Sequence, residues 1–520
     1  MFKAVASEHI RIVSWQGISC ILLSLAAASV GWSILLAIHN LYLHPLRRFN
    51  GPKLWIAFPI LKSIAQLRGQ LDFQIRQFHR IYGNVVRLGP NELTFTSGQS
   101  WRDIYGHGHV ELPKVFPKGT GHGDSGRPSE IISADARTHF RFRRAMLPAF
   151  SNKALDQQEP LIQVYVDLLI DKLRRVAAEG RQTDMVQWYT FTTFDLIGDL
   201  AFGESFGGLK AGKQNAWVTN VERMMRLFPI LVLANASPLL SKIFLLVAGE
   251  KIQQSRQKHL NLVKVLVTKR LEKKDREHRG DFMDCMMRSH GQEHGLSNDE
   301  LVANSDTLIV AGSETTATLL CGVTYFLLST PEALGKCVME VRSAFRSSKE
   351  ISFKTASSRL PYMLACLEEA LRLLPPVPTV LFRHTPPGQV TMVDGYDIPE
   401  RTCVGVHHMS AYHSDTNFHR ARDFCPERWL PEVQGDPASP FSHDQRDAFK
   451  PFSTGPRDCI GRNLAYHEMR LILAHVLWNF DLRLAPQSRG WTESQRTFAL
   501  WEKPPLMIEL RARADIEKEA

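Results

Sequence analysis

The sequence has few cysteines and none in a paired motif. Its 520 residues include eight cysteines, with no C-x-x-C pair and no spacing that is typical of a disulfide framework. The main body is therefore expected to work in a reducing compartment, with most of its cysteines chemically inert. No second cysteine lies near Cys459, so a closed zinc or iron–sulfur cage would have too few ligands there.

The chain also lacks a nucleic-acid-binding motif, although its formal net charge is +10. Lysine and arginine are spread along the chain, which argues against DNA or RNA as a partner. An acidic protein partner or an anionic membrane surface fits this charge better. With a hydrophobic fraction of 44%, the chain can bury one large core, and a single domain fits.

Two short motifs match other classes of enzyme but lack the context that those enzymes need. Residues 121–126 form a G-x-G-x-x-G sequence, but prolines precede it instead of a strand, so a dinucleotide site is not expected. Residues 203–207 form a G-x-S-x-G sequence around Ser205, which in serine hydrolases lies between a strand and a helix. The glycine-rich segment that follows is a poor helix start, so a serine hydrolase is a remote alternative.

An uncharged apolar segment covers residues 12–38, about the length that spans a bilayer as a helix. The alternative is a cleavable signal peptide with its small residues at 26–28, but the apolar run continues beyond them for longer than such a peptide needs. More cations follow the segment, within residues 47–53, than precede it, which places the C-terminal body in the cytosol. Residues 44–52 form a basic, proline-containing linker.

The segment Phe452–Gly461 is shaped around one cysteine, Cys459. Gly455 permits a turn, Pro456 fixes its own φ, and Gly461 leaves room for a group to approach the backbone. An amphipathic helix is predicted from Gly461 onward, so the sulfur lies near a helix N-terminus whose free N–H groups favour a thiolate. A thiolate binds metal, and haem iron needs only one from the protein. The alternative is a buried, unreactive cysteine in a turn.

Phe452, Gly455, Arg457, Cys459 and Gly461 together form F-x-x-G-x-R-x-C-x-G, and this segment resembles the haem-binding signature of the cytochrome P-450 monooxygenases. The resemblance covers residues 42–512 and, in the linker after the anchor, extends to fungal members. It implies haem b, with Cys459 as the axial ligand of the iron and Phe452 packed near the sulfur. Arg457 can pair with a haem propionate.

Residues 135–144 carry basic side chains on two faces of a predicted helix. His139 and Arg143 are four residues apart, and the resemblance implies that this pair binds the haem propionates. Arg137, Arg141 and Arg144 form a stripe on roughly the opposite face. This stripe is either a docking surface for an acidic reductase or a solvated basic face.

Ser297 and Glu300 form a capping box, and the apolar pattern that follows continues to Leu328, which predicts a helix of about thirty residues. A glycine and a polar run interrupt its apolar middle at residues 311–316. This segment matches the family motif A/G-G-x-D/E-T-T, whose small residues open space for O2 and whose Glu314 and Thr315 relay protons. The alternative for Thr315 is a hydrogen bond back to a helix carbonyl.

Glu369 and Arg372 lie three residues apart on a predicted helix, which by itself indicates a surface pair. The resemblance adds Arg428, in the segment 426–429, as the third member of a buried network, and losing any member is expected to prevent haem incorporation. Arg383 resembles a second propionate arginine. It ends a short predicted strand that starts at residue 379.

The remaining segments complete the predicted frame. Residues 84–89 and 92–96 favour a β-hairpin around a Gly-Pro turn. Residues 227–247 are apolar but broken by Pro229, Pro238 and Lys242, which favours a pair of lid helices near substrate and membrane over a second membrane span. Candidates for the substrate pocket are Val380, Leu381 and residues 497–501.

We therefore predict a mainly α fold with a small β region, the cytochrome P-450 fold, in residues 42–520, preceded by one transmembrane anchor in residues 1–41. The resemblance implies a monooxygenase that hydroxylates or oxidises a small apolar natural-product intermediate, a terpenoid, polyketide or alkaloid. No plausible dinucleotide or flavin domain is present, so electrons from NADPH must come through a separate NADPH-cytochrome P-450 reductase, with cytochrome b5 as a further partner. The expected location is the endoplasmic reticulum membrane, with the catalytic domain in the cytosol.

A haem-binding sensor without catalytic activity is the alternative from another class. Its haem could be held by Cys459 in the same way. Glu314 and Thr315 argue against it, because ligation alone needs no proton relay.

Overall fold

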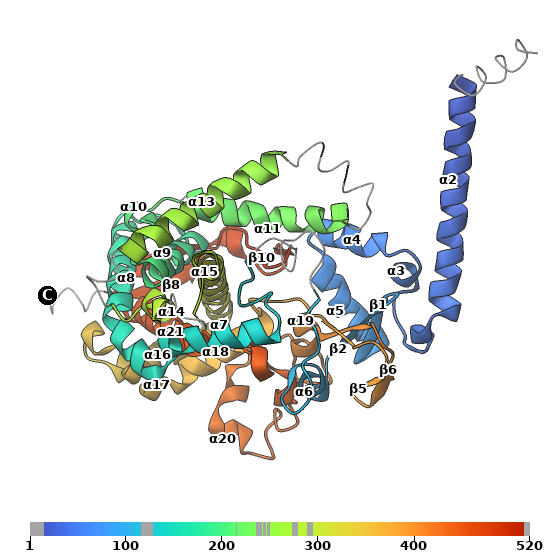
Figure 1. The fold of residues 1–520 in the computed structure, drawn as a ribbon. Coiled ribbons are helices and arrows are strands. Elements are labelled where there is room, and N and C mark those ends of the chain that lie inside the picture. The colour runs from blue at the N-terminus through green and yellow to red at the C-terminus, as the bar shows by residue number, and fades with distance from the viewer. Residues whose placement is uncertain are drawn as a thin grey trace, which may run out of the picture.

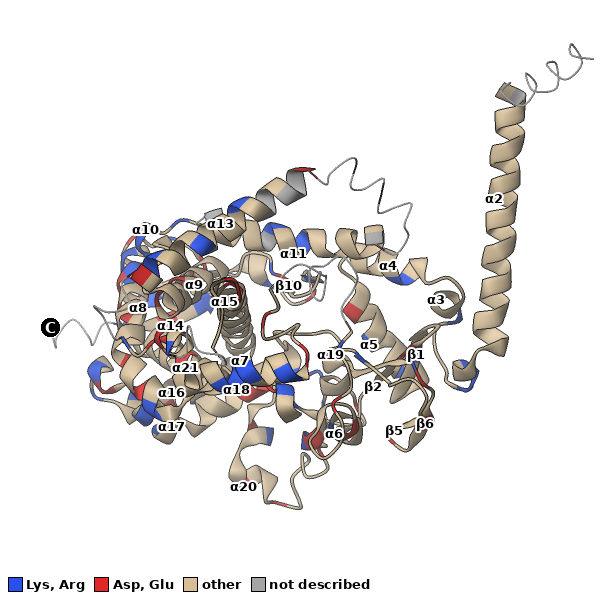
Figure 2. Cartoon of the chain, in the orientation of Figure 1, with Lys and Arg blue, Asp and Glu red and all other residues tan. Residues whose placement is uncertain are grey.

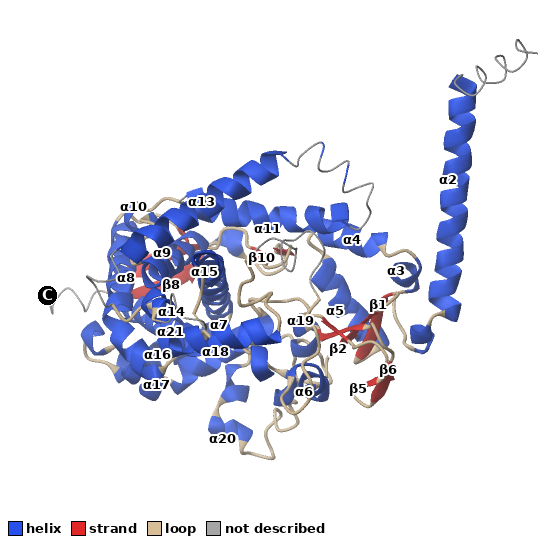
Figure 3. Ribbon diagram, in the orientation of Figure 1, coloured by secondary structure: helices blue, strands red, loops and turns tan. Residues whose placement is uncertain are grey.

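The computed structural model describes residues 15–115, 128–214, 216–235, 242, 246, 250–272, 279–288 and 295–513. The G-x-G-x-x-G sequence at 121–126 lies outside these residues. Helices make up most of the molecule, and the strands are short and gathered in small sheets (Figure 3). The predicted fold class, mainly α with a small β region, is confirmed.

Helix α2 (Trp15–Ile38) projects away from the body of the molecule (Figure 1), and η1 (His39–Leu43) continues it. The stretch Gly17–Leu43 has a mean hydropathy of 2.2 and is only 6% buried. A long apolar helix that packs against almost nothing is a candidate membrane anchor. The chain then turns through η2 (Pro45–Arg48) and α3 (Lys53–Ala57) into the body.

The body is built from helices that pack around one large hydrophobic core, and a smaller cluster around Trp55 and Val86 lies beside the β1–β2 hairpin. Its first half contains α4 (Ile60–Leu67), α5 (Leu71–Tyr82), α6 (Gly98–Tyr105), α7 (Ala136–Met146), η3 (Leu147–Phe150), α8 (Asn152–Ala178), α9 (Met185–Phe202), α10 (Gly208–Ala211), α11 (Ala216–Asn235), α13 (Glu250–Glu272) and α14 (Phe282–Met287). Its second half contains α15 (Asn298–Ser329), α16 (Pro331–Ala344), η5 (Ser348–Glu350), α17 (Phe353–Arg359), α18 (Pro361–Leu373), α19 (His408–Tyr412), η6 (Pro426–Trp429), α20 (Pro431–Gln434), η7 (Arg446–Ala448), η8 (Gly455–Arg457), α21 (Arg462–Asn479) and η9 (Pro486–Ser488).

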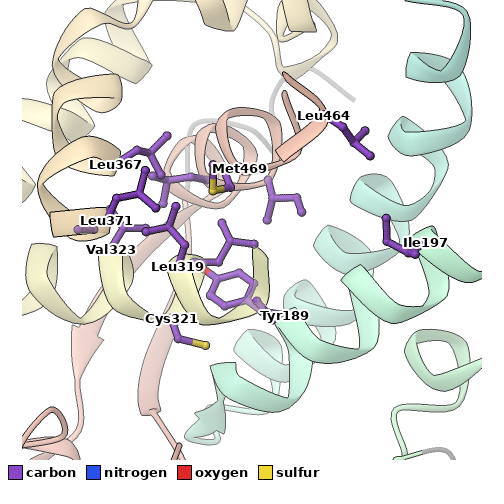
Figure 4. Packing of buried hydrophobic residues seen from close by; sticks show 14 of the residues in the cluster. Tyr189, Ile197, Leu319, Cys321, Val323, Leu367, Leu371, Leu464 and Met469 are labelled. Atoms are coloured by element: carbon purple, nitrogen blue, oxygen red, sulfur yellow. The ribbon is translucent and has the colours of Figure 1, made fainter. Parts of the chain in front are cut away.

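Helix α15 is the central element, and its 32 residues confirm the predicted long helix. Ser297 Oγ accepts a hydrogen bond from Glu300 N at 3.3 Å, and the Glu300 carboxylate accepts one from Ser297 N at 2.9 Å, so the predicted capping box is present. Side chains of α9, α15, α18 and α21 interlock around its C-terminal half (Figure 4). This packing fixes the position of α15 relative to α21, which begins next to Cys459.

Within the described residues, the strands form four small sheets. The predicted hairpin is β1 (Val85–Gly89) with β2 (Glu92–Phe95), and β2 continues the sheet through parallel β7 (Cys403–Val406) to β4 (Arg383–His384). The strand expected from residue 379 is shorter than predicted, because Val380 makes only an isolated bridge to His407. The other sheets pair β3 (Thr183–Asp184), β11 (Met507–Ala512) and β8 (Phe480–Leu484); β5 (Thr391–Val393) and β6 (Tyr396–Ile398); and β9 (Arg496–Thr497) and β10 (Trp501–Glu502).

Two sequence expectations concern segments around α9 and α11. Helix α9, and not a strand, precedes Ser205, and Gly203 ends that helix with a left-handed φ of 76°. The Ser205 hydroxyl accepts a hydrogen bond from Gly207 N at 3.0 Å, so this segment is a turn and has no nucleophile elbow. The break expected at Pro229 is wrong, because α11 runs through it. Most of the second expected lid helix lies outside the described residues.

Candidate active site

The loop before α21 presents Cys459 through a tight backbone path. Gly455 has a φ of 81°, and a Cβ there would lie 1.7 Å from the main-chain oxygen of Tyr105, so this position requires glycine. Cys459 N donates to Phe452 O at 2.9 Å, which closes the loop. A Cβ on Gly461 would meet only ordinary contacts from the protein. Gly461 therefore leaves room on the side of the sulfur, as predicted.

The Cys459 side chain is exposed. Burial among the surrounding protein atoms nevertheless raises the pKa of the thiol, while a hydrogen bond from the Gly461 backbone lowers it. The Cys459 thiol is surrounded by protein atoms and is still accessible, so it faces a hollow inside the protein and not the outer surface. The Gly461 backbone lowers the pKa of the thiol, as expected from the helix N-terminus, but burial raises the pKa by more. The loop alone therefore does not favour the thiolate. A bound metal cation would supply the positive charge that favours the thiolate.

Helix α7 clamps this loop. Arg143 donates to Asp458 O at 2.7 Å and to the Asp458 carboxylate at 2.5 Å, immediately before the cysteine. Its predicted contact with a propionate stays a prediction, and the structure adds a role in fixing the loop. Arg141 pairs with Glu300 at 2.5 and 3.0 Å, so the predicted stripe is wrong for this residue.

A cluster of cations gathers near the loop. Burial and the charges of Arg457 and Arg383 lower the pKa of Lys114 to about 7. Burial and the charges of Arg457 and Lys114 likewise lower the pKa of His139 to about 3. Among the described residues, the buried Nε of Arg383 has no hydrogen-bond partner. Arg457 is partly compensated by Glu111, at 2.6 Å.

Lys114, Arg383 and Arg457 bring positive charges together in a largely buried place, which favours a bound anion, whereas His139, with a pKa of about 3, adds no charge at neutral pH. Two propionate carboxylates would supply that charge and a partner for the Arg383 Nε, so these residues fit a haem. His139, Arg383 and Arg457 were expected here from the sequence. Lys114 was missed, because a lone lysine carries no motif.

The middle of α15 differs in part from expectation. A Cβ on Gly312 would lie 2.9 Å from Ile197 of α9, so this glycine serves the close packing of two helices, not space for O2. Ala311 is exposed although it lies in the middle of the central helix. Thr315 Oγ donates to Ala311 O at 2.7 Å, which is the helix back-bond that the sequence left as an alternative.

Glu314 makes a contact that the sequence did not predict. Its carboxylate is paired with the ammonium of Lys503, which lies in the segment after β10. The two residues are 189 positions apart, more than a third of the chain, and no local pattern connects them. The predicted roles of Glu314 and Thr315 in proton relay stay predictions.

Glu468 of α21 ties the helix of the cysteine to α15. It is 1% exposed, and the Thr316 side chain of α15 lowers its pKa by less than burial raises it. Burial raises its pKa to about 8. The carboxyl group is therefore neutral at neutral pH, so α15 and α21 are joined without burying a charge.

We expect Glu468→Gln to change how stability depends on pH. The pKa of Glu468 in the folded protein, about 8, lies above the unfolded value of about 4.3. Its contribution is therefore complete below about pH 4.3 and decreases as pH rises to about 8. Glutamine stays neutral and avoids this loss. The unfolding midpoint of the variant should therefore increase relative to that of the wild type as pH rises. Circular dichroism measures both midpoints. A surface change, Glu179→Gln, should show no such trend.

The buried network predicted around Glu369 is present. Arg372 donates to both Glu369 oxygens, at 2.7 and 2.9 Å, and Arg428 donates to one of them at 3.1 Å. The side chains of all three are 0% exposed. Asp444 is a fourth member, 2.5 Å from Arg428, which the sequence did not indicate. Burial would raise the pKa of Glu369, but the two arginines hold it below its ordinary value.

An accessible cysteine just before α21, with Arg457 two residues away in a cluster of basic side chains, is the arrangement expected of a haem-thiolate protein. The comparisons agree with this class. The family model described as Cytochrome P450 matches residues 50–510. Cytochrome P450 monooxygenase dtxS2 of Metarhizium robertsii is 49% identical over 507 residues, 97% of each chain.

Two further relatives carry more specific names. The trichothecene C-4 hydroxylase of Trichoderma arundinaceum is 50% identical over 476 residues, 92% of this chain and 94% of the relative. The averantin hydroxylase of Dothistroma septosporum is 37% identical over 515 residues, 98% of this chain and 94% of the relative. The chain belongs to the cytochrome P450 family and is a cytochrome P450 monooxygenase. Haem iron is the cofactor of this family, and its monooxygenases use O2 and a redox partner.

Proposed function

We propose that this monooxygenase hydroxylates a small apolar natural-product intermediate, a terpenoid, polyketide or alkaloid, in a fungal biosynthetic pathway. The observation that carries the proposal is the similarity, at 49% and 50% identity, to fungal P450 monooxygenases that include a trichothecene hydroxylase. The cationic cluster around Arg383 supports haem binding at Cys459. The finding that α9 precedes Ser205 removes support from the hydrolase alternative.

The candidate haem-binding residues have distinct proposed roles. Cys459 would hold haem b through its iron, and His139, Arg383 and Arg457 would bind the propionates, joined by Lys114. Haem iron supplies O2 activation when bound, and a thiolate ligand promotes O–O cleavage. Phe452 packs beside the sulfur, where its ring lies 5.1 Å from that of Tyr466.

Glu314 and Thr315 supply protons on the α15 side. Glu314 accepts a proton from solvent and passes it to the Thr315 hydroxyl, which hands on its own proton. Such a relay needs the Glu314 carboxylate and the Thr315 hydroxyl to be positioned for proton transfer from one to the other.

The electrons come from NADPH through a separate NADPH-cytochrome P-450 reductase, with cytochrome b5 as a further donor. Arg137 and Arg144 are exposed on α7, with Phe140, 68% exposed, between them. Figure 2 shows basic residues along this helix. An exposed ring flanked by cations fits an acidic protein surface. In this proposal the anchor lies in the endoplasmic reticulum membrane and the haem domain lies on its cytosolic face.

The proposal is tested by metabolite profiling after deletion of the gene. The deletion strain should accumulate an apolar compound that lacks one or more oxygens found in the product of the parent strain. Microsomes that contain the protein should convert that compound with NADPH and O2. An unchanged metabolite profile together with no conversion of candidate intermediates would contradict the proposal.

We expect Thr315→Ala to separate NADPH consumption from product formation. Without the hydroxyl, product formation should fall by about 10²-fold, the low side of what a positioned proton donor contributes, while NADPH consumption falls much less. The measurement is the ratio of product to NADPH consumed. Thr307→Ala is the matched control, because Thr307 donates to Ala303 O at 3.0 Å in the same helix. Equal ratios in the two variants would remove the relay role.

A further inference from the structure

Tyr466 of α21 forms a hydrogen-bonded pair with a carboxylate of α18. Its hydroxyl donates to Glu368 Oε1 at 2.7 Å, and both side chains are only partly exposed. Burial raises the pKa of the Tyr466 phenol, so the phenol is neutral at neutral pH. Burial also raises the pKa of Glu368 above its ordinary value, which makes this carboxylate a stronger base than an exposed one. The pair therefore joins a phenol to a base that is positioned to accept its proton.

The next residue of α18 shows by contrast why Glu368 suits this task. Glu369 is held by two arginines, which keep its pKa below the ordinary value. A carboxylate in that state is a poor proton acceptor. Successive residues of a helix point to different sides of it, so Glu368 and Glu369 have different neighbours. Glu368 contacts α21 and keeps the basicity that Glu369 lacks.

Tyr466 is connected to the cysteine loop through Phe452. The centroids of the Tyr466 and Phe452 rings lie 5.1 Å apart, within the range of packed aromatic pairs. Phe452 O accepts a hydrogen bond from Cys459 N at 2.9 Å. Packed rings and hydrogen bonds are short steps for an electron. An electron therefore has a short route from Tyr466 to the group that Cys459 would bind.

Arg470 influences which oxidised form of Tyr466 is stable. Its guanidinium carbon lies 5.2 Å from the centroid of the Tyr466 ring, and its Nη1 donates to Ser357 Oγ at 3.2 Å. A cation held beside the ring disfavours a second positive charge on that ring. Loss of an electron from Tyr466 is therefore favourable when the phenol proton leaves as well, and Glu368 is the base in contact with that proton.

We propose that Tyr466 is a redox-active residue that protects the bound haem from unused oxidising equivalents, with Glu368 as its proton acceptor. One electron passes from Tyr466 to the oxidised haem centre, the phenol O–H bond breaks, and the proton forms a new O–H bond on Glu368. One electron from NADPH, delivered by the redox partner, then reduces the tyrosyl radical, which recovers its proton from Glu368. Two such cycles complete the reaction H2O2 + NADPH + H⁺ → 2 H2O + NADP⁺. This inference rests on the proposed binding of haem at Cys459.

Electron paramagnetic resonance detects the radical directly. The haem-loaded protein, with deuterium-labelled tyrosine to identify the signal, is mixed with H2O2 without substrate and frozen at successive times. The wild type should give a tyrosyl signal, and Tyr466→Phe should lose it. Glu368→Gln keeps the ring but removes the base, so the signal should form about 10²-fold more slowly, the low side of what a positioned proton acceptor contributes. An unchanged signal in Tyr466→Phe would overturn the inference.

Tyr165 provides the matched control. Its hydroxyl donates to Asp199 Oδ2 at 2.7 Å, the same distance as in the pair of Tyr466 and Glu368. Tyr165 lies on α8 and Asp199 on α9, and within the described part of the chain Phe452 pairs with the Tyr466 ring and not with the Tyr165 ring. Tyr165→Phe should therefore keep the radical signal. Loss of the signal in this variant as well would show that a tyrosine–carboxylate pair alone does not locate the radical.

The survival of the haem gives a second readout. With NADPH and reductase present and substrate absent, the carbon monoxide difference spectrum should decline faster in Tyr466→Phe than in the wild type or Tyr165→Phe. Equal rates of decline would contradict the protective role. The starting spectrum separates the two proposals. A wild type without a haem-thiolate spectrum contradicts haem binding at Cys459, whereas a normal spectrum without a tyrosyl signal contradicts only the role of Tyr466.

Discussion

Cys459→Ser should abolish monooxygenase activity and the haem-thiolate spectrum while leaving the fold intact. Serine has nearly the size of cysteine, and the hydrogen bond of 2.9 Å from the residue 459 N–H to Phe452 O does not involve the side chain. The loop should therefore keep its shape. A hydroxyl does not replace the thiolate as an electron donor to iron. The carbon monoxide difference spectrum of the reduced protein measures this loss directly.

A second cysteine provides the control for this prediction. Cys403 is partly buried, and its Sγ lies 3.6 Å from His384 Nδ1, so Cys403→Ser tests the same chemical change away from the loop. Its spectrum and activity should match the wild type. A normal haem-thiolate spectrum in Cys459→Ser would mean that another residue binds the iron. Far-ultraviolet circular dichroism of both variants checks that the fold is retained.

The sequence predicted the parts of the site that depend on local pattern. The capping box fixed the start of α15, and the spacing of glycines around Cys459 predicted the loop, because each of these features is decided by neighbouring residues. The Glu369 network was also located, through the resemblance to a family. By contrast, the strand before Arg383 was overextended, since tertiary pairing decides how much of a short apolar run joins a sheet.

The sequence did not predict contacts between distant segments. Lys503 meets Glu314, Asp444 meets Arg428, and Arg141 meets Glu300, each across a long stretch of chain. Gly312 shows how this changes an interpretation. A glycine among polar residues suggested space for a ligand, whereas the facing Ile197 makes it a packing residue. A single chain gives no signal for such pairs.

The network around Glu369 contacts several segments of the haem domain, so the loss of Glu369 should destabilise the whole domain. Arg372 also donates to Tyr412 O at 2.8 Å, and Arg428 donates to His419 O at 2.8 Å. Trp429 Nε1 donates to Glu369 at 2.9 Å. The network thus joins α18 to η6 and to the segment that leads toward the cysteine loop. Removing one charge leaves the others buried without compensation.

Glu369→Gln is therefore expected to lower stability by about 3–5 kcal/mol, the cost of leaving a buried partner charge unpaired, and to prevent haem incorporation. Haem content per protein and the urea unfolding midpoint measure the two effects. The surface pair of Lys336 and Glu427, 2.7 Å apart, is the matched control, and Lys336→Gln should cost only about 0–1 kcal/mol. Full haem content in Glu369→Gln with altered product specificity would contradict the structural role.

The same network should also make the protein sensitive to acid. Because the pKa of Glu369 is held below its ordinary value, its contribution is present above the unfolded value of about 4.3 and is lost as pH falls through the lower folded value. Arg428→Lys should shift haem loss to higher pH, since one ammonium cannot replace the separate contacts of a guanidinium to Glu369 and Asp444. The pH at which half of the haem is released measures this shift, and equal values for Arg428→Lys and the wild type would show that the network does not control haem retention.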